Sequence, residues 1–373
     1  MPNLFIATGI FYPEPGGPAT YLYEVLPALQ ARGWSIKVLT YGDDNTTVYP
    51  YPVERIARRA LPIRRINYAL SSRPYLQWAD VVYAHTIDLP LIGKKTSPRL
   101  IKIVGDQAWE RCIRKGWISP TEDIDLFQRK KYHGIVAQQQ RSRQRQVQAM
   151  DAVIVPSHYL KQMVHGWGVP EEQVHVVYNT LPPLVGDRLS QEEAREQLGL
   201  DEGPLLMTAA RLEPWKGAQH IIAALKQVPD VRLLVAGDGP MLGRLQADTH
   251  SLGNRVQFLG RLPRATVYQY MQAVDYFVLY SGYEGLPHSL LESLRLGTPV
   301  IASEKGGNVE VVRPGSNGFL VPYVDVDALA QTIEAALATG KRDELAARAH
   351  IGTERFDFED MIASTDDILR RFV

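Results

Sequence analysis

Two glutamates, Glu284 and Glu292, have the types and spacing that point most directly to chemistry. They flank a short loop that turns into a predicted helix, directly after the apolar run 276–280. The N-terminus of such a helix carries unpaired N–H groups and a partial positive charge, which suits a phosphate. Eight residues of helix span about 12 Å, close to the length of a sugar diphosphate. The pair therefore predicts a site in which one carboxylate holds sugar hydroxyls and the other holds ribose hydroxyls.

Two cations follow another predicted strand. Arg211 and Lys216 come after residues 205–209, and in open α/β sheets ligands bind outside the carboxyl ends of the strands. Arginine offers a forked donor and lysine a point charge, so together they could neutralise a diphosphate. Surface cations would give the same pattern, but the paired glutamates favour a binding role.

Two glycine pairs occupy similar positions. Gly16-Gly17 stands between the first predicted strand and the first helix, and Gly306-Gly307 follows the predicted strand 299–302. Glycine lets the backbone approach a ligand closely. A tight turn without a ligand is the alternative for both pairs.

A histidine and an aspartate also stand at predicted strand ends. His85 ends the strand 81–84, and Asp106 lies just beyond the strand 100–104. Their positions predict roles in the ligand cleft, and a hydrogen-bonded loop residue is the alternative reading of each.

Other familiar patterns are absent or incomplete. The run 237–243 is not GxGxxG, because its third glycine falls one residue late, and no phosphate-binding P-loop is present. The acidic pairs Asp123/Asp125 and Asp325/Asp327 resemble metal ligands, but we expect the second pair to cap a helix. The histidines show no ligand spacing, so no metal site is predicted.

Apolar runs alternate with amphipathic stretches along the chain, which predicts an α/β protein with parallel sheets. The predicted strands are 4–8, 35–40, 81–84, 100–104, 152–155, 174–177, 205–209, 232–236, 256–259, 276–279, 299–302 and 318–321. Predicted helices include 19–32, 216–227 and 327–338.

The proline-rich stretch 182–187 is expected to connect two doubly wound, Rossmann-like domains that face a cleft. Just beyond it, Ser190 and Glu193 form a predicted capping box. We place an acceptor-side domain at 1–181, a nucleotide-sugar domain at 182–354, and a last helix at 355–373 that packs back on the first domain.

The composition is that of a soluble globular protein, with 45% hydrophobic and 22% charged residues and no net charge. No run is long and apolar enough to span a membrane. A single cysteine, Cys112, excludes an internal disulfide. The N-terminus lacks the basic region of a signal peptide, so a cytoplasmic protein is expected.

The first half of the chain is basic and the second half acidic. Basic residues alternate with isoleucine or tryptophan in residues 54–73 and 109–145. This pattern favours a surface for anionic lipid or a phosphorylated acceptor, at the inner face of the membrane; a solvated helix face is the alternative. No nucleic-acid partner is expected.

Taken in order, these motifs resemble the retaining glycosyltransferases of the GT-B fold, usually called family 4. The resemblance covers nearly the whole chain and rests on an ordered set of short segments. They are Gly16-Gly17, His85, Val155-Pro156-Ser157, Val177-Tyr178-Asn179, Arg211 with Lys216, residues 236–240, residues 259–262, Glu284 with Glu292, and Gly306-Gly307-Asn308-Val309-Glu310.

The resemblance implies a role for each matched residue. Glu292 would hold the ribose and Glu284 the transferred sugar, with Arg211 and Lys216 on the diphosphate and His85 near the anomeric carbon. The implied catalytic set is His85, Glu284, Arg211 and Lys216. The implied donor-binding set is Gly16, Gly17, Arg211, Lys216, Gly237, Leu262, Glu284, Gly285, Leu286, Pro287, His288 and Glu292. Asp106 and Trp109 are expected on the acceptor side, and neither a metal nor another cofactor is expected.

The expected reaction moves a sugar from a UDP- or GDP-linked donor to an acceptor hydroxyl. Retention of configuration and a place in cell-envelope glycan or glycolipid synthesis follow from the resemblance and the basic surface. One alternative is a sugar-nucleotide epimerase of similar build, which would convert the donor without any acceptor. A second is a nucleotide-sugar-binding protein without catalysis.

Overall fold

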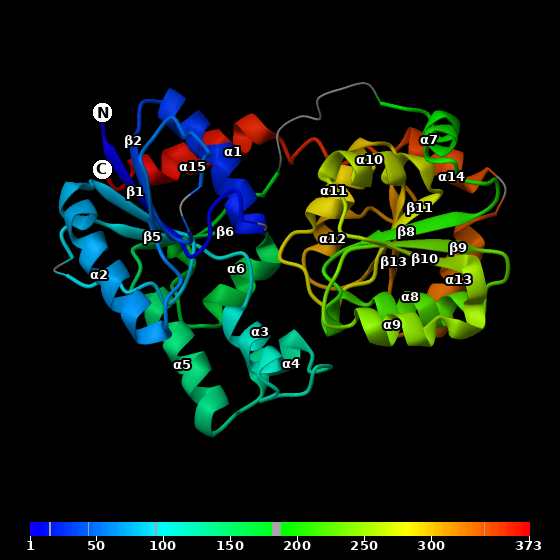
Figure 1. Ribbon diagram of the computed structural model, residues 1–373, viewed down its shortest axis with the longest axis horizontal. Coiled ribbons are helices and arrows are strands. Elements are labelled where there is room, and N and C mark those ends of the chain that lie inside the picture. The colour runs from blue at the N-terminus through cyan, green and yellow to red at the C-terminus, as the bar shows by residue number, and fades with distance from the viewer. Residues whose placement is uncertain (15, 44, 94, 181–187, 339) are drawn as a thin grey trace. The chain divides into compact units, whose positions relative to one another are not determined.

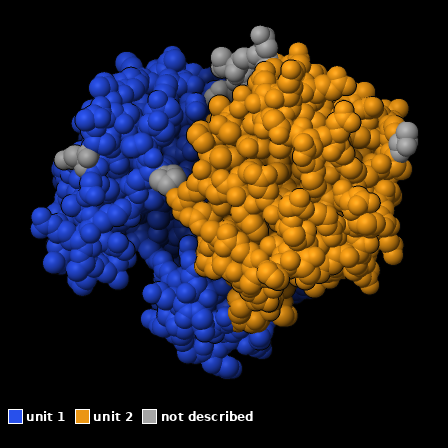
Figure 2. Space-filling view, turned by 45° about the vertical axis from the view of Figure 1, so that its right-hand side comes forward, with its two compact units in different colours: residues 1–118, 127–183, 356–373 blue, residues 119–126, 184–355 orange. Residues whose placement is uncertain are grey.

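The computed structural model describes residues 1–14, 16–43, 45–93, 95–180, 188–338 and 340–373 (Figure 1). The chain forms two compact units, coloured separately in Figure 2. Unit 1 comprises residues 1–118, 127–183 and 356–373, and unit 2 comprises residues 119–126 and 184–355. The predicted connection at 182–187 lies outside the described residues.

Unit 1 is built on a parallel sheet of seven strands in the order β3-β2-β1-β4-β5-β6-β7. The central strands are buried on both faces, which explains their near-continuous apolar sequences. The strands are β1 Asn3–Ala7, β2 Ser35–Tyr41, β3 Val53–Ile56, β4 Val81–Ala84, β5 Arg99–Lys102, β6 Ala152–Val155 and β7 Val174–Val176.

Helices connect these strands, and the last helix of the chain returns to unit 1. On one side of the sheet, Leu22 and Leu26 of α1 share a buried apolar cluster with Ile362 and Leu369 of α15. The helices are α1 Gly17–Ala31, α2 Leu61–Trp78, α3 Gln107–Arg114, α4 Ile124–Arg129 (which begins in unit 2), α5 Gly134–Gln148, α6 His158–His165 and α15 Phe358–Arg370, with a short 3-10 turn η1 at Glu171–Gln173.

Unit 2 contains a six-stranded parallel sheet in the order β10-β9-β8-β11-β12-β13. Its strands are β8 Leu205–Ala209, β9 Arg232–Ala236, β10 Val256–Gly260, β11 Tyr276–Leu279, β12 Val300–Ser303 and β13 Gly318–Val321. Its helices are α7 Gln191–Leu198, α8 Ala218–Leu225, α9 Leu242–Asp248, α10 Arg264–Ala273, α11 His288–Arg295, α12 Asn308–Val311, α13 Val326–Ala336 and α14 Lys341–Ala347, with 3-10 turns η2 Pro214–Lys216 and η3 His250–Arg255.

The structure confirms two doubly wound parallel α/β sheets. The capping box is confirmed as well, because Ser190 accepts from the Glu193 N–H while the Glu193 carboxylate accepts from the Ser190 N–H. Asp325 caps α13 by accepting from the Ala328 N–H. Among the described residues, no helix is long and apolar enough to cross a membrane.

Three elements differ from expectation. The strand β3 was not predicted, because it is an edge strand whose Glu54 and Arg55 interrupt the apolar pattern. Strand β5 ends at Lys102 rather than at residue 104. Residues 119–126 group with unit 2 although they were placed in the first domain.

Candidate active site

Each sheet has one point at which the strand order reverses, and this is where open α/β sheets bind ligands. In unit 2 the chain builds β8, β9 and β10 outward in one direction and β11, β12 and β13 in the other. Arg211 and Lys216 follow β8, and Glu284 follows β11. The predicted cations and the first predicted carboxylate therefore lie on the two loops beside the unit 2 switch point.

Lys216 and Glu284 contact each other directly. The Lys216 Nζ lies 2.7 Å from the Glu284 Oε1, and the two side chains are only 18% and 12% exposed. Limited exposure strengthens an ion pair relative to one in water. Arg211 differs, because its side chain is 59% exposed and lies 3.6 Å from Glu213. One cation is thus fixed in place, and the other extends into solvent.

The switch-point loops approach so closely that only glycine fits between them. A Cβ on Gly217 would lie 1.7 Å from the Tyr280 carbonyl oxygen, and one on Gly237 would lie 1.9 Å from that of Ala210. Both glycines have positive φ, of 75° and 130°. The Gly217 contact holds the loop that carries Lys216 against the loop that leads to Glu284, and the Gly237 contact holds the loop after β9 against the Lys216 loop.

The second predicted glycine pair acts in the same way. The Gly307 N–H donates to the Glu284 carbonyl oxygen at 2.8 Å, and a Cβ on Gly306 would lie 2.4 Å from that same oxygen. Gly306-Gly307 therefore supports the backbone of Glu284, and the close approach predicted for a ligand is made here to another loop.

Glu292 lies within α11 and has partners that the sequence analysis missed. Its Oε1 accepts from the Tyr268 hydroxyl at 2.8 Å and lies 3.3 Å from Arg264 Nη2. Burial raises the pKa of Glu292, against the opposing effect of Arg264 and Tyr268. Arg264 and Tyr268 are four residues apart on α10, so helical spacing was the only available signal.

Apart from Gly16 and Gly17, which lie in unit 1, the remaining predicted donor-binding residues lie on loops, or at the start of α11, at the same edge of the unit 2 sheet. Gly285, Leu286 and Pro287 connect Glu284 to α11, which begins at His288. Gly237 follows β9 and Leu262 follows β10. The structure therefore gathers this predicted set around the carboxyl ends of four strands, and their contacts with a donor stay a prediction.

The acidic pair Asp123 and Asp125 has a lysine as its partner. The Nζ of Lys305 lies 2.9 Å from Asp123 and 3.2 Å from Asp125. The contact joins residues 119–126 to the rest of unit 2, with which they group, and lysine at that position was not predicted. Across the described parts of the chain, no group of three histidine, cysteine, aspartate or glutamate side chains is arranged to hold a metal ion.

In unit 1, His85 belongs to a buried polar cluster at the end of β4. Its ring packs 4.3 Å from that of Tyr83 and 5.5 Å from that of Tyr21. Burial, and secondarily the charge of Lys102, lowers the pKa of His85 well below its usual value, so the imidazole is neutral. Within the described residues its buried Nε2 has no hydrogen-bond partner, and a role toward a ligand stays a prediction.

Lys102 was missed because it ends an apolar strand, where sequence reasoning expects a core residue. It is 3% exposed, and its Nζ lies 4.3 Å from the centre of the Tyr21 ring. No hydrogen-bond partner for this nitrogen is found in the described residues. Burial lowers the pKa of Lys102 to about 7, so a base that titrates near neutrality lies beside His85.

The other predicted residues of unit 1 have clear structural surroundings. Gly16 caps α1 with φ 155° and Gly17 begins that helix. Asp106 is fully buried, caps α3 through the Ala108 and Trp109 N–H groups, and pairs with Arg143. Trp109 is 2% exposed. The Asp106 geometry accounts for helix capping, and a role for these residues toward an acceptor stays a prediction.

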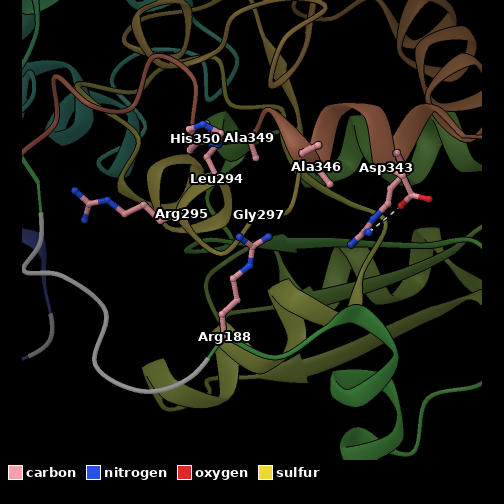
Figure 3. A pocket seen from close by; sticks show the side chains of 10 residues that line it. Arg188, Leu294, Arg295, Gly297, Asp343, Ala346, Ala349 and His350 are labelled. Atoms are coloured by element: carbon pink, nitrogen blue, oxygen red, sulfur yellow. Dashed lines mark hydrogen bonds and ion pairs between the residues drawn. The ribbon is translucent and has the colours of Figure 1, made fainter.

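A separate pocket of about 380 Å³ lies at the other edge of the unit 2 sheet (Figure 3). Leu294 and Arg295 come from the last turn of α11, and Gly297 precedes β12. The predicted residues follow their strands, whereas this pocket lies before β12. It is therefore distinct from the switch-point loops.

Doubly wound sheets with charged loops at both switch points define an α/β protein of the nucleotide-binding type. Two family profiles then match consecutive parts of the chain, the glycosyltransferase family 4 profile at residues 15–183 and the glycosyl transferases group 1 profile at residues 190–351. The chain belongs to this glycosyltransferase family.

Two relatives illustrate the sequence similarity. The chain is 31% identical over 238 residues to D-inositol 3-phosphate glycosyltransferase of Xylanimonas cellulosilytica, covering 60% of this chain and 57% of that protein. It is 25% identical over 364 residues to alpha-monoglucosyldiacylglycerol synthase of Streptococcus pneumoniae, covering 90% and 79%. The matches span only 57%, 59% and 44% of the first three curated relatives.

Solved structures show the same fold. Sucrose-phosphate synthase of Thermosynechococcus elongatus superposes with a TM-score of 0.81 at 21% identity, covering 100% of this chain and 99% of that one. Anabaena HepE in complex with UDP-glucose gives a TM-score of 0.77 at 23% identity, covering 98% and 99%. The GT-B-type fold expected from the sequence is thereby confirmed.

We predict that Lys102→Met stabilises the protein at neutral pH. The folded-state pKa is about 7, whereas that of an unfolded chain is about 10.4. Between these values the unfolded chain binds a proton that the folded protein lacks, so wild-type stability rises with pH. We expect Lys102→Met to gain roughly 2–4 kcal/mol at pH 7, with less than half of that gain remaining near pH 9.5.

Urea unfolding at the two pH values measures this difference. Lys226→Met, at an exposed position after α8, is the matched control and should leave the pH dependence unchanged. Parallel stability–pH curves for wild type and Lys102→Met would show that Lys102 is protonated in the folded protein.

A second prediction concerns the loop contact at Gly217. Alanine there would need a positive φ and would clash with the Tyr280 carbonyl, so Gly217→Ala should lose more than about 2 kcal/mol of unfolding free energy. The control Gly243→Ala lies in α9 with open space around it and should gain up to about 1 kcal/mol. Equal stability of the two variants in chemical denaturation would refute the close approach.

Proposed function

We propose that this protein transfers a sugar from a nucleoside-diphosphate sugar to an acceptor hydroxyl, with retention at the anomeric carbon and without a metal. The observation that carries the proposal is the Lys216–Glu284 pair on the two loops beside the unit 2 switch point. Membership of the glycosyltransferase family supports the reaction class.

The chemistry divides among the residues of unit 2. Lys216 and Arg211 stabilise the charge that develops on the departing diphosphate, and Glu284 orients the sugar through its hydroxyls. Glu292 accepts hydrogen bonds from the ribose. The partly buried Tyr268 contact keeps the Glu292 carboxylate in a single orientation, which reduces the entropy lost on binding.

The transfer step needs no enzyme nucleophile. The bond between the anomeric carbon and the leaving phosphate oxygen breaks while the acceptor oxygen bonds to the same carbon from the same face. The acceptor's proton passes to the leaving phosphate oxygen. His85, as a neutral imidazole, hydrogen-bonds the sugar rather than adding charge.

The donor nucleotide is UDP or GDP. Support comes from HepE, whose structure is in complex with UDP-glucose, and from the GDP-mannose-dependent mannosyltransferase of Mycolicibacterium smegmatis, 33% identical over 181 residues. Lipid appears in the name of the diacylglycerol synthase relative. On this basis we assign a lipid-linked or phosphorylated acceptor and a place in glycolipid or cell-envelope synthesis.

An exposed apolar face of α2 supports the proposal that the protein acts at the inner surface of a membrane. Ile63, Ile66 and Leu70 are 48%, 59% and 53% exposed, and their spacing places them on one helix face. Arg73 continues this face. Apolar side chains bordered by arginine are typical of helices that lie in the lipid interface.

The donor site is tested by comparing nucleoside diphosphates with their sugar conjugates. We expect UDP or GDP to raise the melting temperature by mass action. Lys216→Met should lower the affinity for the nucleotide and for the nucleotide sugar alike, by roughly tenfold or more, because a charge-assisted contact to phosphate is lost. Glu284→Gln should weaken only the nucleotide sugar, since its partner is the sugar.

Glu334→Gln changes an exposed residue of α13 and is the matched control for Glu284→Gln. Its affinity for the nucleotide sugar should equal that of wild type. Incubation of the donor alone completes the test. Conversion to an epimeric donor, or equal affinity of Glu284→Gln and wild type for the nucleotide sugar, would contradict the assignment.

Membrane contact is tested with vesicles of phosphatidylcholine and phosphatidylglycerol. Changing Ile63, Ile66 and Leu70 together to serine should reduce co-sedimentation at least tenfold, because buried apolar area drives interfacial binding. The same change at Ile92, Val309 and Val324, which are also exposed, is the control. Equal co-sedimentation of both variants with wild type would exclude α2 as the contact.

A further inference from the structure

A basic cavity in unit 1 is lined by none of the residues assigned to the donor. It has a volume of about 640 Å³, within the usual range for small-molecule sites. Gly9 follows β1 and Thr86 follows β4, so the cavity opens at the switch point of the unit 1 sheet. The Gly9 N–H donates to the Thr86 hydroxyl at 2.9 Å and joins these two loops.

Cations dominate the cavity wall. They are Arg58, Arg64, Arg65, Arg111 and Lys115, and Asp88 is the one carboxylate that lines the cavity with them. The cations come from α2, from the loop before it and from α3. Five basic side chains converge on a space that their own elements do not fill, which makes the cavity electropositive.

Asp88 is already satisfied by protein groups. Its Oδ2 accepts from Arg111 Nη2 at 2.8 Å, and its Oδ1 accepts from the Gln146 side chain. The Gln146 Oε1 in turn accepts from the Asp88 N–H at 2.6 Å. Asp88 has a φ of 71°, so these bonds hold it in a strained conformation. Its function in the cavity is to fix Arg111.

Three of the cations form no ion pair with a carboxylate in the described residues, and one of them, Arg65, donates instead to the Asp88 carbonyl oxygen at 3.1 Å. Arg64 stacks over the Tyr41 ring at 5.5 Å, and in the described chain neither it nor Lys115 forms an ion pair with a carboxylate. Arg58, by contrast, pairs with Glu14. Arg64 and Lys115 therefore supply uncompensated charge to the cavity.

The rest of the wall suits an uncharged body attached to an anion. Leu61 and Trp117 add apolar surface, and Gln139 and Thr86 add hydrogen-bonding groups. Because arginine and lysine together are the usual partners of phosphate, we propose that this cavity binds a phosphate group of the acceptor, with Arg64 and Lys115 as its principal contacts.

This inference deepens the proposed function, since it assigns the acceptor of the same reaction a phosphate ester. It also assigns the binding of the two phosphate-bearing ligands to different residues. The donor diphosphate meets Lys216 and Arg211 in unit 2, whereas the acceptor phosphate meets a different set of cations in unit 1. The cations of either set can be substituted without altering those of the other set.

The experiment is isothermal titration of the full chain with glycerol 3-phosphate, and with glycerol as the uncharged match. Glycerol 3-phosphate should bind and glycerol should not. Arg64→Gln or Lys115→Gln should each weaken binding roughly tenfold, and the double variant more than either. Arg64→Lys should retain part of the affinity, and the exposed Arg371→Gln should match wild type. Binding that is equal for glycerol and its phosphate, or unchanged in the double variant, overturns the proposal.

Two further measurements keep the outcomes distinct. Vesicles of phosphatidylcholine with phosphatidylglycerol should displace glycerol 3-phosphate if the phosphate belongs to a lipid headgroup, and should leave it bound if the acceptor is a soluble phosphate ester. UDP affinity is measured on every variant and should not change, which also reports correct folding. If the wild-type protein does not bind UDP, the donor assignment is contradicted. The binding of glycerol 3-phosphate would still decide whether the unit 1 cavity binds phosphate.

Discussion

The close backbone approach of the unit 2 loops is the constraint on which the candidate site depends. Gly217 and Gly237 each leave room for a carbonyl oxygen that any side chain would displace. Only because these loops touch can Lys216 from one strand end reach Glu284 from the next at 2.7 Å. Gly237 and the pair Gly306-Gly307, which the sequence suggested as ligand contacts, therefore contact the protein's own backbone and set the positions of the charged loops.

The two units differ in whether their candidate ligand-binding cations form ion pairs. In unit 2 the key charges are compensated, with Lys216 on Glu284, Arg264 on Glu292 and Lys305 on two aspartates. In unit 1, Arg64 and Lys115 have no acidic partner in the described residues, and Lys102 is buried without a hydrogen bond to its nitrogen. A buried cation without a partner, such as Lys102, costs free energy, whereas Arg64 and Lys115 are half-buried and exposed and keep contact with solvent. Cations that are available in this way are consistent with a site whose ligand brings negative charge.

The sequence was sufficient for most of the fold and for part of the site. Buried parallel strands are near-continuous apolar runs, so strands such as Ala152–Val155 and Leu205–Ala209 were predicted at their observed bounds. The edge strand β3 was not, because Glu54 and Arg55 interrupt its apolar pattern. Glu284 and Lys216 were found because their strands ended at recognisable positions. Tyr268 and Lys305 were not, since each meets its partner through tertiary contacts that spacing does not encode.

Lys102 shows why a buried charge escapes such reasoning. Its position at the end of an apolar strand predicts a buried core residue. Only the packing of Tyr21 over its nitrogen shows that the amino group is enclosed. The pattern of residues specifies which positions face inward, but the pKa depends on what surrounds each atom. Residues of this kind are identified by structure alone.

On the proposed function, donor binding in unit 2 is an exchange of partners rather than the filling of an empty charged site. Before the donor arrives, Lys216 and Glu284 neutralise each other, so neither carries an uncompensated charge in a partly buried place. A nucleotide sugar offers both at once, negative oxygens for the lysine and hydroxyl donors for the glutamate. A bare phosphate offers only the first, and would leave Glu284 without its cation. The ion pair thus favours ligands that carry a sugar beside the diphosphate. A ligand without the sugar breaks the ion pair and gives Glu284 no new partner, and this difference produces the selectivity.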